Sequence, residues 1–216
     1  NSNNIRLDYG FFALPGSKKH GANFVKEALE NGANLIISDL AGLQIIEKEN
    51  FTVPILIFIE PRKILAELIS YFFKNIPKKI VGITGTNGKT SIANYLNQIW
   101  EMLGYNSVSI GTIGINGMIT SNTEHTTPDA IKMRWYLNQL FDKGVEKVAL
   151  EASSHGLVQD RLHGINISAG IFTNLSRDHF DYHKNFNSYF KAKAILFEKL
   201  VNQNGGAVIN IDGLKS

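Results

Sequence analysis

The sequence predicts an α/β protein, and two patterns support this fold class. Short apolar runs alternate with amphipathic segments of helix length, which is the order of parallel strands joined by crossover helices. One apolar run leads into the glycine-rich stretch VGITGTNGKTS at residues 81–91, which in turn opens a predicted helix. We therefore expect mostly parallel sheets flanked by helices.

The first part of the chain contains apolar runs separated by segments with helical spacing of apolar residues. The runs at 11–14, 35–38 and 54–59 are expected to be strands. The segments at 22–31 and 63–74 are expected to be helices. This alternation predicts an α/β domain of its own.

The second part repeats the alternation over a longer stretch. Strands are expected at 79–84, 147–151, 169–173 and 207–211. Helices are expected at 89–103, 130–143 and 188–201. The strand at 79–84 runs directly into the glycine-rich stretch, and such a strand is usually the first of a nucleotide-binding domain.

The boundary between the two parts is predicted near residues 76–78, where the helix ending in FFKNIPKK meets that strand. Because a strand that feeds such a loop usually opens its own domain, this position is a natural boundary. The predicted domains are therefore residues 1–77 and residues 78–216.

Composition excludes several classes of function. The 216 residues are 44% hydrophobic and 19% charged, with a net charge of only +3 and no cysteine. Nucleic-acid binding calls for a denser basic surface, and disulfides or thiolate metal sites need cysteine. No apolar run approaches the roughly 20 residues of a membrane span. We expect a cytoplasmic monomer without nucleic-acid or membrane partners, and, because the chain starts without methionine, part of a longer protein.

The stretch at 81–91 is predicted to bind phosphate. Backbone N–H groups of Thr86, Asn87 and Gly88 would surround a phosphate at the start of the helix, and Gly85 would supply backbone freedom. Lys89 would neutralise the β- and γ-phosphates, and Thr90 would offer a hydroxyl to Mg²⁺. The alternative is a tight strand-to-helix turn. Ile83 stands where the common G-x-x-x-x-G-K-S/T pattern has its first glycine, so the loop is a variant.

Glu151 is the candidate metal ligand. It ends the apolar strand at 147–151, and ligands bind at the carboxyl edge of open α/β sheets. The alternative is an ordinary carboxylate at a strand end. The neighbouring Ser154 and His155 do not form a nucleophile–base pair, because adjacent side chains rarely face each other and no G-x-S-x-G turn is present.

Two further features are open to more than one interpretation. His179, Asp181 and His183 recur at every second residue, which on an extended segment would favour a metal site; the alternative is a polar loop.

Lys193 falls within a predicted apolar helix stripe, which is formed by Phe190, Ala194, Phe197, Leu200 and Val201. A snorkelling or paired lysine is the usual explanation, and a chemically changed amine is the other.

Together these motifs resemble the Mur ligase family of ATP-dependent amide-forming enzymes, and within it the MurE type. The phosphate loop TGTNGKTS is similar to that family's own, which also lacks the first glycine. The other similar stretches are HTTPDA at 125–130, EASSHGLVQDR at 151–161, TNLSRDHFDYH at 173–183 and KAKAILF at 191–197. Residues 9–24 resemble the N-terminal domain that binds the uridine end of the substrate.

The resemblance implies a reaction and a role for each residue. The reaction joins a third amino acid to UDP-N-acetylmuramoyl-L-alanyl-D-glutamate through an acyl phosphate, using ATP and Mg²⁺. The implied ATP-binding residues are Gly85, Thr86, Asn87, Gly88, Lys89, Thr90 and Ser91. The implied metal ligands are Thr90, Glu151, His179 and Lys193, the last as a CO₂-derived carbamate. The implied substrate-binding residues are Ser2, Thr126, Thr127, Ser153, Gln159 and Arg161.

Other interpretations remain open at this point. The threonines could cap the next helix, and Arg161 could form a surface ion pair. Asn1 and Asn3 stand where the family often has aspartate and arginine, which puts those contacts in question. The family's C-terminal domain, which presents the amino acid, does not appear, so the chain alone is expected to be inactive and the added residue is either diaminopimelate or lysine.

The competing functions belong to different classes. A folylpolyglutamate synthase would be another ATP-dependent amide ligase on the same scaffold. A P-loop kinase or NTPase would form ADP without forming an amide. A non-catalytic module would bind a nucleotide or UDP-sugar without turnover.

Overall fold

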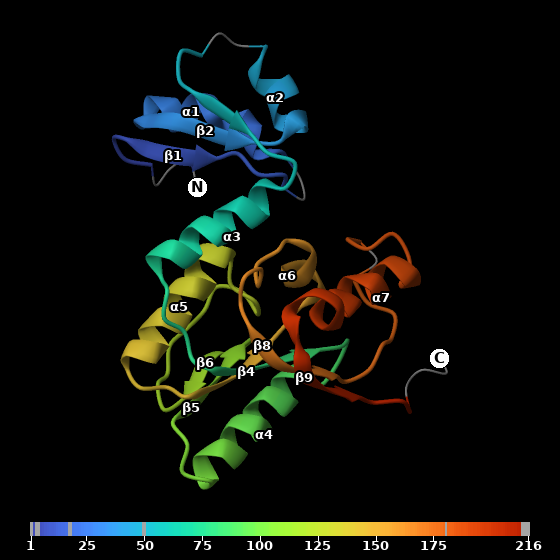
Figure 1. The fold of residues 1–216 in the computed structure, drawn as a ribbon. Coiled ribbons are helices and arrows are strands. Elements are labelled where there is room, and N and C mark those ends of the chain that lie inside the picture. The colour runs from blue at the N-terminus through green and yellow to red at the C-terminus, as the bar shows by residue number, and fades with distance from the viewer. Residues whose placement is uncertain (1, 3–4, 17–18, 49–50, 180, 213–216) are drawn as a thin grey trace. The chain divides into compact units, whose positions relative to one another are not determined.

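The computed structural model describes residues 2, 5–16, 19–48, 51–179 and 181–212. The chain forms two compact units, Asn1–Leu65 and Ala66–Ser216, each described here by itself. Both are α/β, as predicted (Figure 1). The sequence placed the division later, at 77–78, and most of helix α3 (Pro61–Phe72) falls between the two positions.

The first unit is built on a parallel sheet with strand order β1-β2-β3. Its elements are β1 (Tyr9–Phe12), the 3₁₀ turn η2 (Gly21–Phe24), α1 (Val25–Glu30), β2 (Ala33–Ser38), α2 (Leu40–Ile46) and β3 (Ile55–Ile57). Phe11, Val25, Ile36 and Ile46 are buried together, so the helices cover the sheet through an apolar core. The sequence did not predict α2, whose start is capped by the Asp39 carboxylate accepting the Gly42 N–H at 2.7 Å.

The second unit is built on a larger sheet with strand order β6-β5-β7-β4-β8-β9. Its strands are β4 (Lys79–Thr84), β5 (Ser107–Gly111), β6 (Gly114–Gly117), β7 (Lys147–Glu151), β8 (Ile167–Phe172) and β9 (Val201–Ile209). Its helices are α4 (Lys89–Met102), α5 (Ala130–Asp142), α6 (Ser154–Val158), α7 (Phe186–Ile195) and the π-helical turn η3 (Leu196–Leu200). Among the strands of the described residues, β5 and β6 pair antiparallel and the other neighbours pair parallel.

The central strands of this sheet are buried on both faces. Along β4, Ile83 packs with Ala93 of α4, whereas Ile80 belongs to the cluster that contains Met133 and Leu137 of α5. Successive strand residues point to opposite faces, which is why near-continuous apolar runs form these strands. In Figure 1, α4 covers one face and α5 the other. The carboxyl ends of β4 and β7 therefore lie side by side at the same edge of the sheet, and the buried core holds both strands in place.

Several elements differ from the prediction. The sequence missed β5, β6 and the short helix α6. The helix predicted over 188–201 is formed by α7 and the π-helical turn η3, which together span residues 186–200, whereas β9 begins at Val201, earlier than the strand predicted over 207–211. Because β9 is an exposed edge strand, backbone pairing with β8 holds it, and its polar and glycine residues give no apolar signal.

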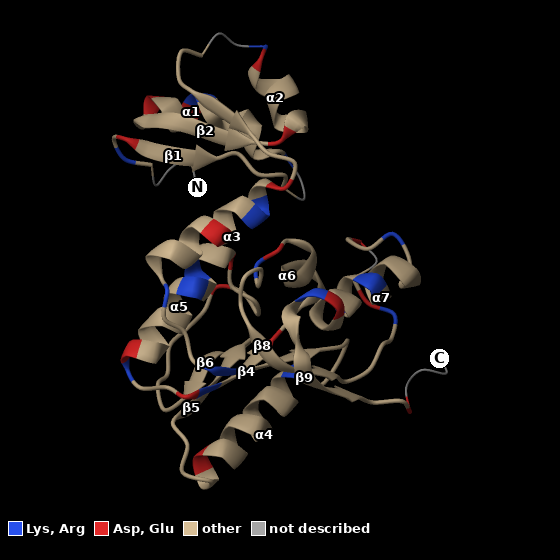
Figure 2. Ribbon diagram, in the orientation of Figure 1, with Lys and Arg blue, Asp and Glu red and all other residues tan. Residues whose placement is uncertain are grey.

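Charged residues of both signs are interspersed along each unit (Figure 2). This mixture agrees with the small net charge of +3. Among the described residues, every helix falls short of the length and apolarity needed to cross a bilayer.

Candidate active site

The glycine-rich loop connects β4 to α4 and has the backbone shape that its glycines permit. Gly85 has a φ of 143°, and a Cβ there would lie 1.9 Å from the Thr173 hydroxyl oxygen. Gly88 has a φ of 84° in the left-handed region and precedes the first residue of α4. Both positions therefore require glycine, one for close approach and one for conformation.

The N–H groups of the loop divide into two sets. Those of Thr86 and Asn87, expected to surround the phosphate, donate instead to Asn174, at 3.0 Å to its backbone oxygen and 2.9 Å to its side-chain oxygen. The N–H groups in the first turn of α4 have no partner within the helix, as at any helix start. The N–H groups of Lys89, Thr90 and Ser91 are therefore the ones placed to meet an anion at the start of the helix.

Lys89 directs its ammonium back over the loop. It donates to the backbone oxygens of Gly85 at 3.1 Å and Thr86 at 2.7 Å. Burial lowers the pKa of Lys89, and the Glu151 and Asp178 carboxylates partly oppose that shift. A cation held beside the loop in this way suits the phosphates of a nucleotide.

Glu151 lies at the carboxyl end of β7, as predicted, and is almost completely buried. Its carboxylate accepts hydrogen bonds from the Thr90 hydroxyl at 3.0 Å and from Thr112, through the backbone N–H at 2.9 Å and the hydroxyl at 3.3 Å. Among the described residues, all the hydrogen-bond donors to this carboxylate are neutral. A buried anion beside a hydroxyl, offering only oxygen ligands, fits Mg²⁺.

A cleft of about 420 Å³ brings most of the predicted residues together. Its predicted lining residues are Thr86, Asn87, Gly88, Lys89, Thr90, Ser91, Thr126, Glu151, Ser153 and His179. The sequence missed Thr112 and Asp178, which also line it, and Asn174, which holds the loop. Asn174 and Asp178 belong to the quoted motif TNLSRD, so they could have been predicted as site residues from it. Thr112 belongs to none of the quoted motifs, so no feature of the sequence pointed to it.

The other predicted substrate-binding residues of this unit form a hydrogen-bonded network beside the cleft. The Thr127 hydroxyl is buried and donates to the Glu151 backbone oxygen at 2.8 Å. Arg161 donates to the Thr127 backbone oxygen at 2.6 Å and through two nitrogens to the Gln159 side-chain oxygen. Ser153 caps α6 by accepting the Gly156 N–H at 3.1 Å.

The structure settles one alternative interpretation. Helix α5 is capped by Asp129, whose carboxylate accepts the N–H groups of Ile131 and Lys132, both at 3.0 Å. Thr126 and Thr127 are therefore not its caps. Their hydroxyls are engaged near Glu151 instead.

Lys193 is 1% exposed, and the predicted apolar stripe is correct only in part: Phe190, Ala194 and Phe197 line one apolar cavity, but Lys193 lies on a different, buried face of the helix. The buried face of α7 consists of Tyr189, Ala192 and Lys193 itself, whereas Phe190 is 42% exposed and Phe197 lines a separate apolar cavity of about 310 Å³. Val201 lies in β9 and not on a helix. Lys193 therefore faces the phosphate loop, whereas Phe190 lies on another face of the helix and borders the same cavity as Phe197.

The Lys193 ammonium has two neighbours in this buried position. It donates to the Gly85 backbone oxygen at 2.6 Å and lies 4.2 Å from the centre of the Tyr189 ring. Burial is the main reason that the pKa of Lys193 falls to about 7, and the nearby Lys89 ammonium lowers it further, against the effect of Asp178. Near neutral pH a large fraction of this amine is therefore uncharged.

The histidine segment is not extended, so the expected alternation of side chains is wrong. The His183 N–H donates to the His179 backbone oxygen at 2.8 Å, which closes a turn, and Phe180 lies outside the described residues. His183 is buried and its pKa is lowered mainly by burial, whereas the His179 side chain is 46% exposed. No set of three His, Asp or Glu side chains suited to a metal occurs within the described ranges. His179 instead stands edge-on to His155, with ring centres 5.0 Å apart.

Ser2 belongs to the first unit. Its hydroxyl donates to the Glu27 carboxylate at 3.0 Å, and the Asn31 side chain donates to its backbone oxygen at 3.1 Å. These contacts hold Ser2 against α1. The positions Asn1 and Asn3, which depart from the family pattern, lie outside the described residues.

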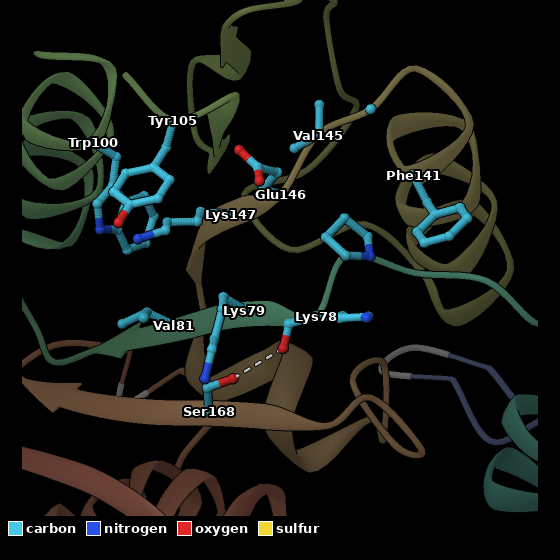
Figure 3. A pocket seen from close by; sticks show the side chains of 12 residues that line it. Lys78, Lys79, Val81, Trp100, Tyr105, Phe141, Val145, Glu146, Lys147 and Ser168 are labelled. Carbon is cyan, nitrogen blue, oxygen red and sulfur yellow. Dashed lines mark hydrogen bonds between the residues drawn. The ribbon is translucent and has the colours of Figure 1, made fainter. Parts of the chain in front are cut away.

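A larger pocket of about 720 Å³ lies at the opposite, amino-terminal end of β4 and β7 (Figure 3). Lys79 and Lys147 open these two strands there, and the Lys147 ammonium lies 3.2 Å from the centre of the Tyr105 ring. None of the predicted site residues lines this pocket. Size alone therefore does not identify the active site.

The fold and the cleft are those of an α/β nucleotide-binding protein, with a glycine-rich loop leading into a helix and a buried carboxylate at the end of the neighbouring strand. Comparison with protein families agrees and is more specific. Residues 83–215 match the Mur ligase middle domain, and residues 2–73 match the domain described as the Mur ligase family catalytic domain. The chain belongs to the Mur ligase family.

Individual relatives fall within one type of that family. The chain is 46% identical over 203 residues to a UDP-N-acetylmuramoyl-L-alanyl-D-glutamate--2,6-diaminopimelate ligase of Bradyrhizobium diazoefficiens, covering 94% of this chain and 41% of that protein. A protein of the same name from Mesorhizobium japonicum is 40% identical over 218 residues, covering 98% of this chain and 43% of that protein. The chain thus spans about two fifths of the length of these relatives.

Solved structures give the same picture. A structure of a ligase of that name superposes with a TM-score of 0.78 at 32% identity, covering 98% of this chain and 42% of that one. The MurF ligase from Thermotoga maritima, solved in complex with ADP, superposes with a TM-score of 0.57 at 22% identity. The matched region is 98% of this chain and 45% of the MurF chain. The second likeness concerns the fold alone.

Proposed function

We propose that this chain is the substrate-binding and ATP-binding part of a ligase that joins diaminopimelate to UDP-N-acetylmuramoyl-L-alanyl-D-glutamate in peptidoglycan synthesis. One observation carries the proposal: a single cleft holds the phosphate loop, the buried carboxylate of Glu151 and the hydroxyls of Thr126 and Ser153. The names of the similar proteins support diaminopimelate over lysine as the added residue. The reaction consumes ATP, so the proposed location is the cytoplasm, and the proposed state is a monomer.

Each of the two predicted domains has its own proposed binding role. Residues 1–77, with Ser2, would bind the uridine end of the substrate. Residues 78–216 would bind ATP and the acyl end. Thr126 and Ser153 line the cleft and would contact the dipeptide directly, whereas Thr127, Gln159 and Arg161 would shape the wall through their hydrogen bonds to one another.

In the proposed reaction a substrate carboxylate oxygen attacks the γ-phosphorus of ATP, and ADP leaves with the electrons of the broken P–O bond. The diaminopimelate amine then attacks the acyl phosphate carbon, phosphate leaves, and an amide forms. Two anions must approach each other in the first step, so Lys89 and the N–H groups at the start of α4 would offset their repulsion. Bound Mg²⁺, which Thr90 and Glu151 would hold, supplies further charge compensation.

Lys193 and His179 complete the proposed site. The buried, partly neutral amine of Lys193 would react with CO₂ to form a carbamate, and His179 would ligate a second Mg²⁺ from its exposed position at the cleft. The Lys193 pKa of about 7 supports the first part. The second part rests on the position of His179 among the lining residues.

Product analysis tests the proposal. The full-length parent protein is incubated with ATP, Mg²⁺ and the UDP-muramoyl dipeptide, with diaminopimelate, lysine or no amino acid added. We expect the tripeptide only with diaminopimelate, detected by mass spectrometry. Tripeptide formation with lysine but not with diaminopimelate would contradict the specificity, and ADP formation that never yields amide would indicate a kinase or NTPase.

The same experiment distinguishes the remaining alternatives. The 216-residue chain alone should bind the UDP-muramoyl dipeptide in calorimetry without forming tripeptide. A folate-directed ligase would not bind that dipeptide. A non-catalytic module would bind it, but its full-length parent would form neither ADP nor amide.

A further inference from the structure

We propose that Thr112 is a positioning residue that links the metal-binding carboxylate of Glu151 to the acyl-substrate site at Thr126. This inference rests on the proposed function, since the roles of Glu151 and Thr126 come from it. Thr112 directly follows β5, a strand that the sequence did not predict. No motif pointed to it.

Thr112 holds both carboxylate oxygens of Glu151. Its backbone N–H donates to Oε1 at 2.9 Å, and its hydroxyl donates to Oε2 at 3.3 Å. Oε2 also accepts the Thr90 hydroxyl at 3.0 Å. Two contacts from one residue to two oxygens restrict rotation of the carboxylate plane, which determines the direction that the free lone pairs face.

The backbone before Thr112 is shaped to receive this carboxylate. A Cβ at Gly111 would lie 1.8 Å from Oε1 of Glu151. Any larger residue at this position would displace the carboxylate or the backbone. The close approach of β5 to Glu151 is therefore built into the fold and brings the Thr112 N–H within hydrogen-bonding distance.

The available protons fix the direction of the hydrogen bonds between Thr126, Thr112 and Glu151. A carboxylate only accepts, so the Thr112 hydroxyl must give its single proton to Glu151 when that bond forms. The Thr126 hydroxyl lies 3.0 Å from the Thr112 hydroxyl and must then be the donor between the two. The order of donation is Thr126 to Thr112 to Glu151.

This order has a consequence for the ligand. With its proton directed at Thr112, Thr126 offers lone pairs to the cleft, where both residues are lining residues. Thr126 would then accept a hydrogen bond from an N–H group, such as the amide of the muramoyl dipeptide, and not bind its carboxylate. Occupation of the metal site and recognition of the acyl substrate are coupled through Thr112.

The test compares hydroxyl-deleting and hydroxyl-retaining variants in the full-length protein. Thr112→Val removes the hydroxyl but keeps the shape and the backbone N–H, and Thr112→Ser keeps the hydroxyl. Thr123→Val is the matched control, because the Thr123 hydroxyl in the same region bonds only backbone oxygens, those of Gly111 and His125. Calorimetry measures the Mg²⁺ concentration needed for half-maximal ADP binding and, separately, the Kd of the UDP-muramoyl dipeptide.

We expect Thr112→Val to raise the required Mg²⁺ concentration about tenfold, the effect of losing one hydrogen bond to a charged group. Its dipeptide Kd should rise several-fold, while Thr112→Ser and Thr123→Val stay within about threefold of the parent protein. The loss of dipeptide-binding free energy in the double variant Thr112→Val, Thr126→Val should be smaller than the sum of the losses in the two single variants, because both changes remove the same chain of hydrogen bonds.

Two results would overturn the inference. One is an unchanged Mg²⁺ requirement in Thr112→Val; the other is an equal loss in Thr112→Ser, which would indicate packing and not hydrogen bonding. Failure of the proposed function looks different: the parent protein would bind Mg²⁺ and ADP but not the dipeptide. In that case the Mg²⁺ measurement still decides the link between Thr112 and Glu151.

Discussion

The Lys193 ammonium donates a hydrogen bond of 2.6 Å to the Gly85 backbone oxygen, across a separation of 108 residues. The contact joins helix α7 to the phosphate loop, and the Gly85 oxygen also accepts from Lys89 at 3.1 Å. Two lysine side chains therefore converge on one carbonyl. Their mutual repulsion adds to burial in lowering the pKa of Lys193.

The first prediction concerns stability against pH. The pKa of Lys193 is about 7 in the folded chain and has an ordinary value of 10.5. Between these values the unfolded chain binds the additional proton, so the contribution of Lys193 to the free energy of unfolding rises with pH. The slope is at most about 1.4 kcal/mol per pH unit. Lys193→Met should remove this contribution.

Urea denaturation at pH 7.5 and pH 9 in CO₂-free buffer measures the effect. Both tryptophans, Trp100 and Trp135, lie in the second unit, so their fluorescence reports the unit that contains Lys193. The wild-type chain should gain more stability than Lys193→Met over this range. Parallel pH dependence of the two proteins would contradict the lowered pKa.

The second prediction is that Lys193 carries a carbamate in the active parent protein. The neutral amine attacks CO₂ and loses a proton, and the resulting anion would be compensated by the Lys89 ammonium and by bound Mg²⁺. ¹³C-labelled bicarbonate should give a carbamate NMR signal in the wild-type protein that is absent from Lys193→Met.

Activity provides a second measure of the same prediction. Lys193→Ala in the full-length parent should lose most activity and recover part of it with added acetate, which would occupy the vacated anion position. Lys191→Ala, an exposed lysine on the same helix, is the control and should remain active. Full activity of Lys193→Met without bicarbonate would rule the carbamate out.

The third prediction concerns Lys89. Because its ammonium is fixed beside the phosphate loop by two carbonyl contacts, Lys89→Ala should abolish acyl-phosphate formation in the parent protein. Binding of the UDP-muramoyl dipeptide should change by no more than a few-fold. Hydroxylamine trapping measures the acyl phosphate, and calorimetry measures binding. Unchanged turnover in Lys89→Ala would remove this lysine from the mechanism.

The fourth prediction concerns Gly111. A Cβ at this position would meet the Glu151 carboxylate, so Gly111→Ala should weaken Mg²⁺-dependent ADP binding more than tenfold. Gly206→Ala in β9 is the control, because its Cβ would meet nothing nearer than 3.6 Å. Calorimetry on the parent protein measures both variants. Wild-type Mg²⁺ dependence in Gly111→Ala would show that Glu151 does not need its present position.

Local pattern was enough to predict the elements that carry the phosphate loop. The strands at 79–84 and 147–151 were predicted with their observed bounds, because both are buried on two faces and read as apolar runs. The placement of Lys89, Thr90 and Glu151 at one cleft could also be predicted, because a strand end or a glycine-rich turn fixes each of them at the same edge of the sheet. The family was also identified from these motifs.

Elements without a strong local pattern were missed or misplaced. β6 contains two glycines, α6 has only five residues, and β9 is exposed along most of its length. Backbone pairing and capping hold these elements, and neither leaves an apolar periodicity in the sequence.

The α/β class, the glycine-rich loop and the family could thus be inferred from the amino-acid sequence, since these depend on residues close together in the chain. The folded structure was needed to show which distant groups meet. It placed Asn174 on the N–H groups of the loop, Thr112 on both oxygens of Glu151, and Lys193 on the Gly85 carbonyl. Such contacts depend on strand order and on which helix face is buried, and both result from packing across the whole domain.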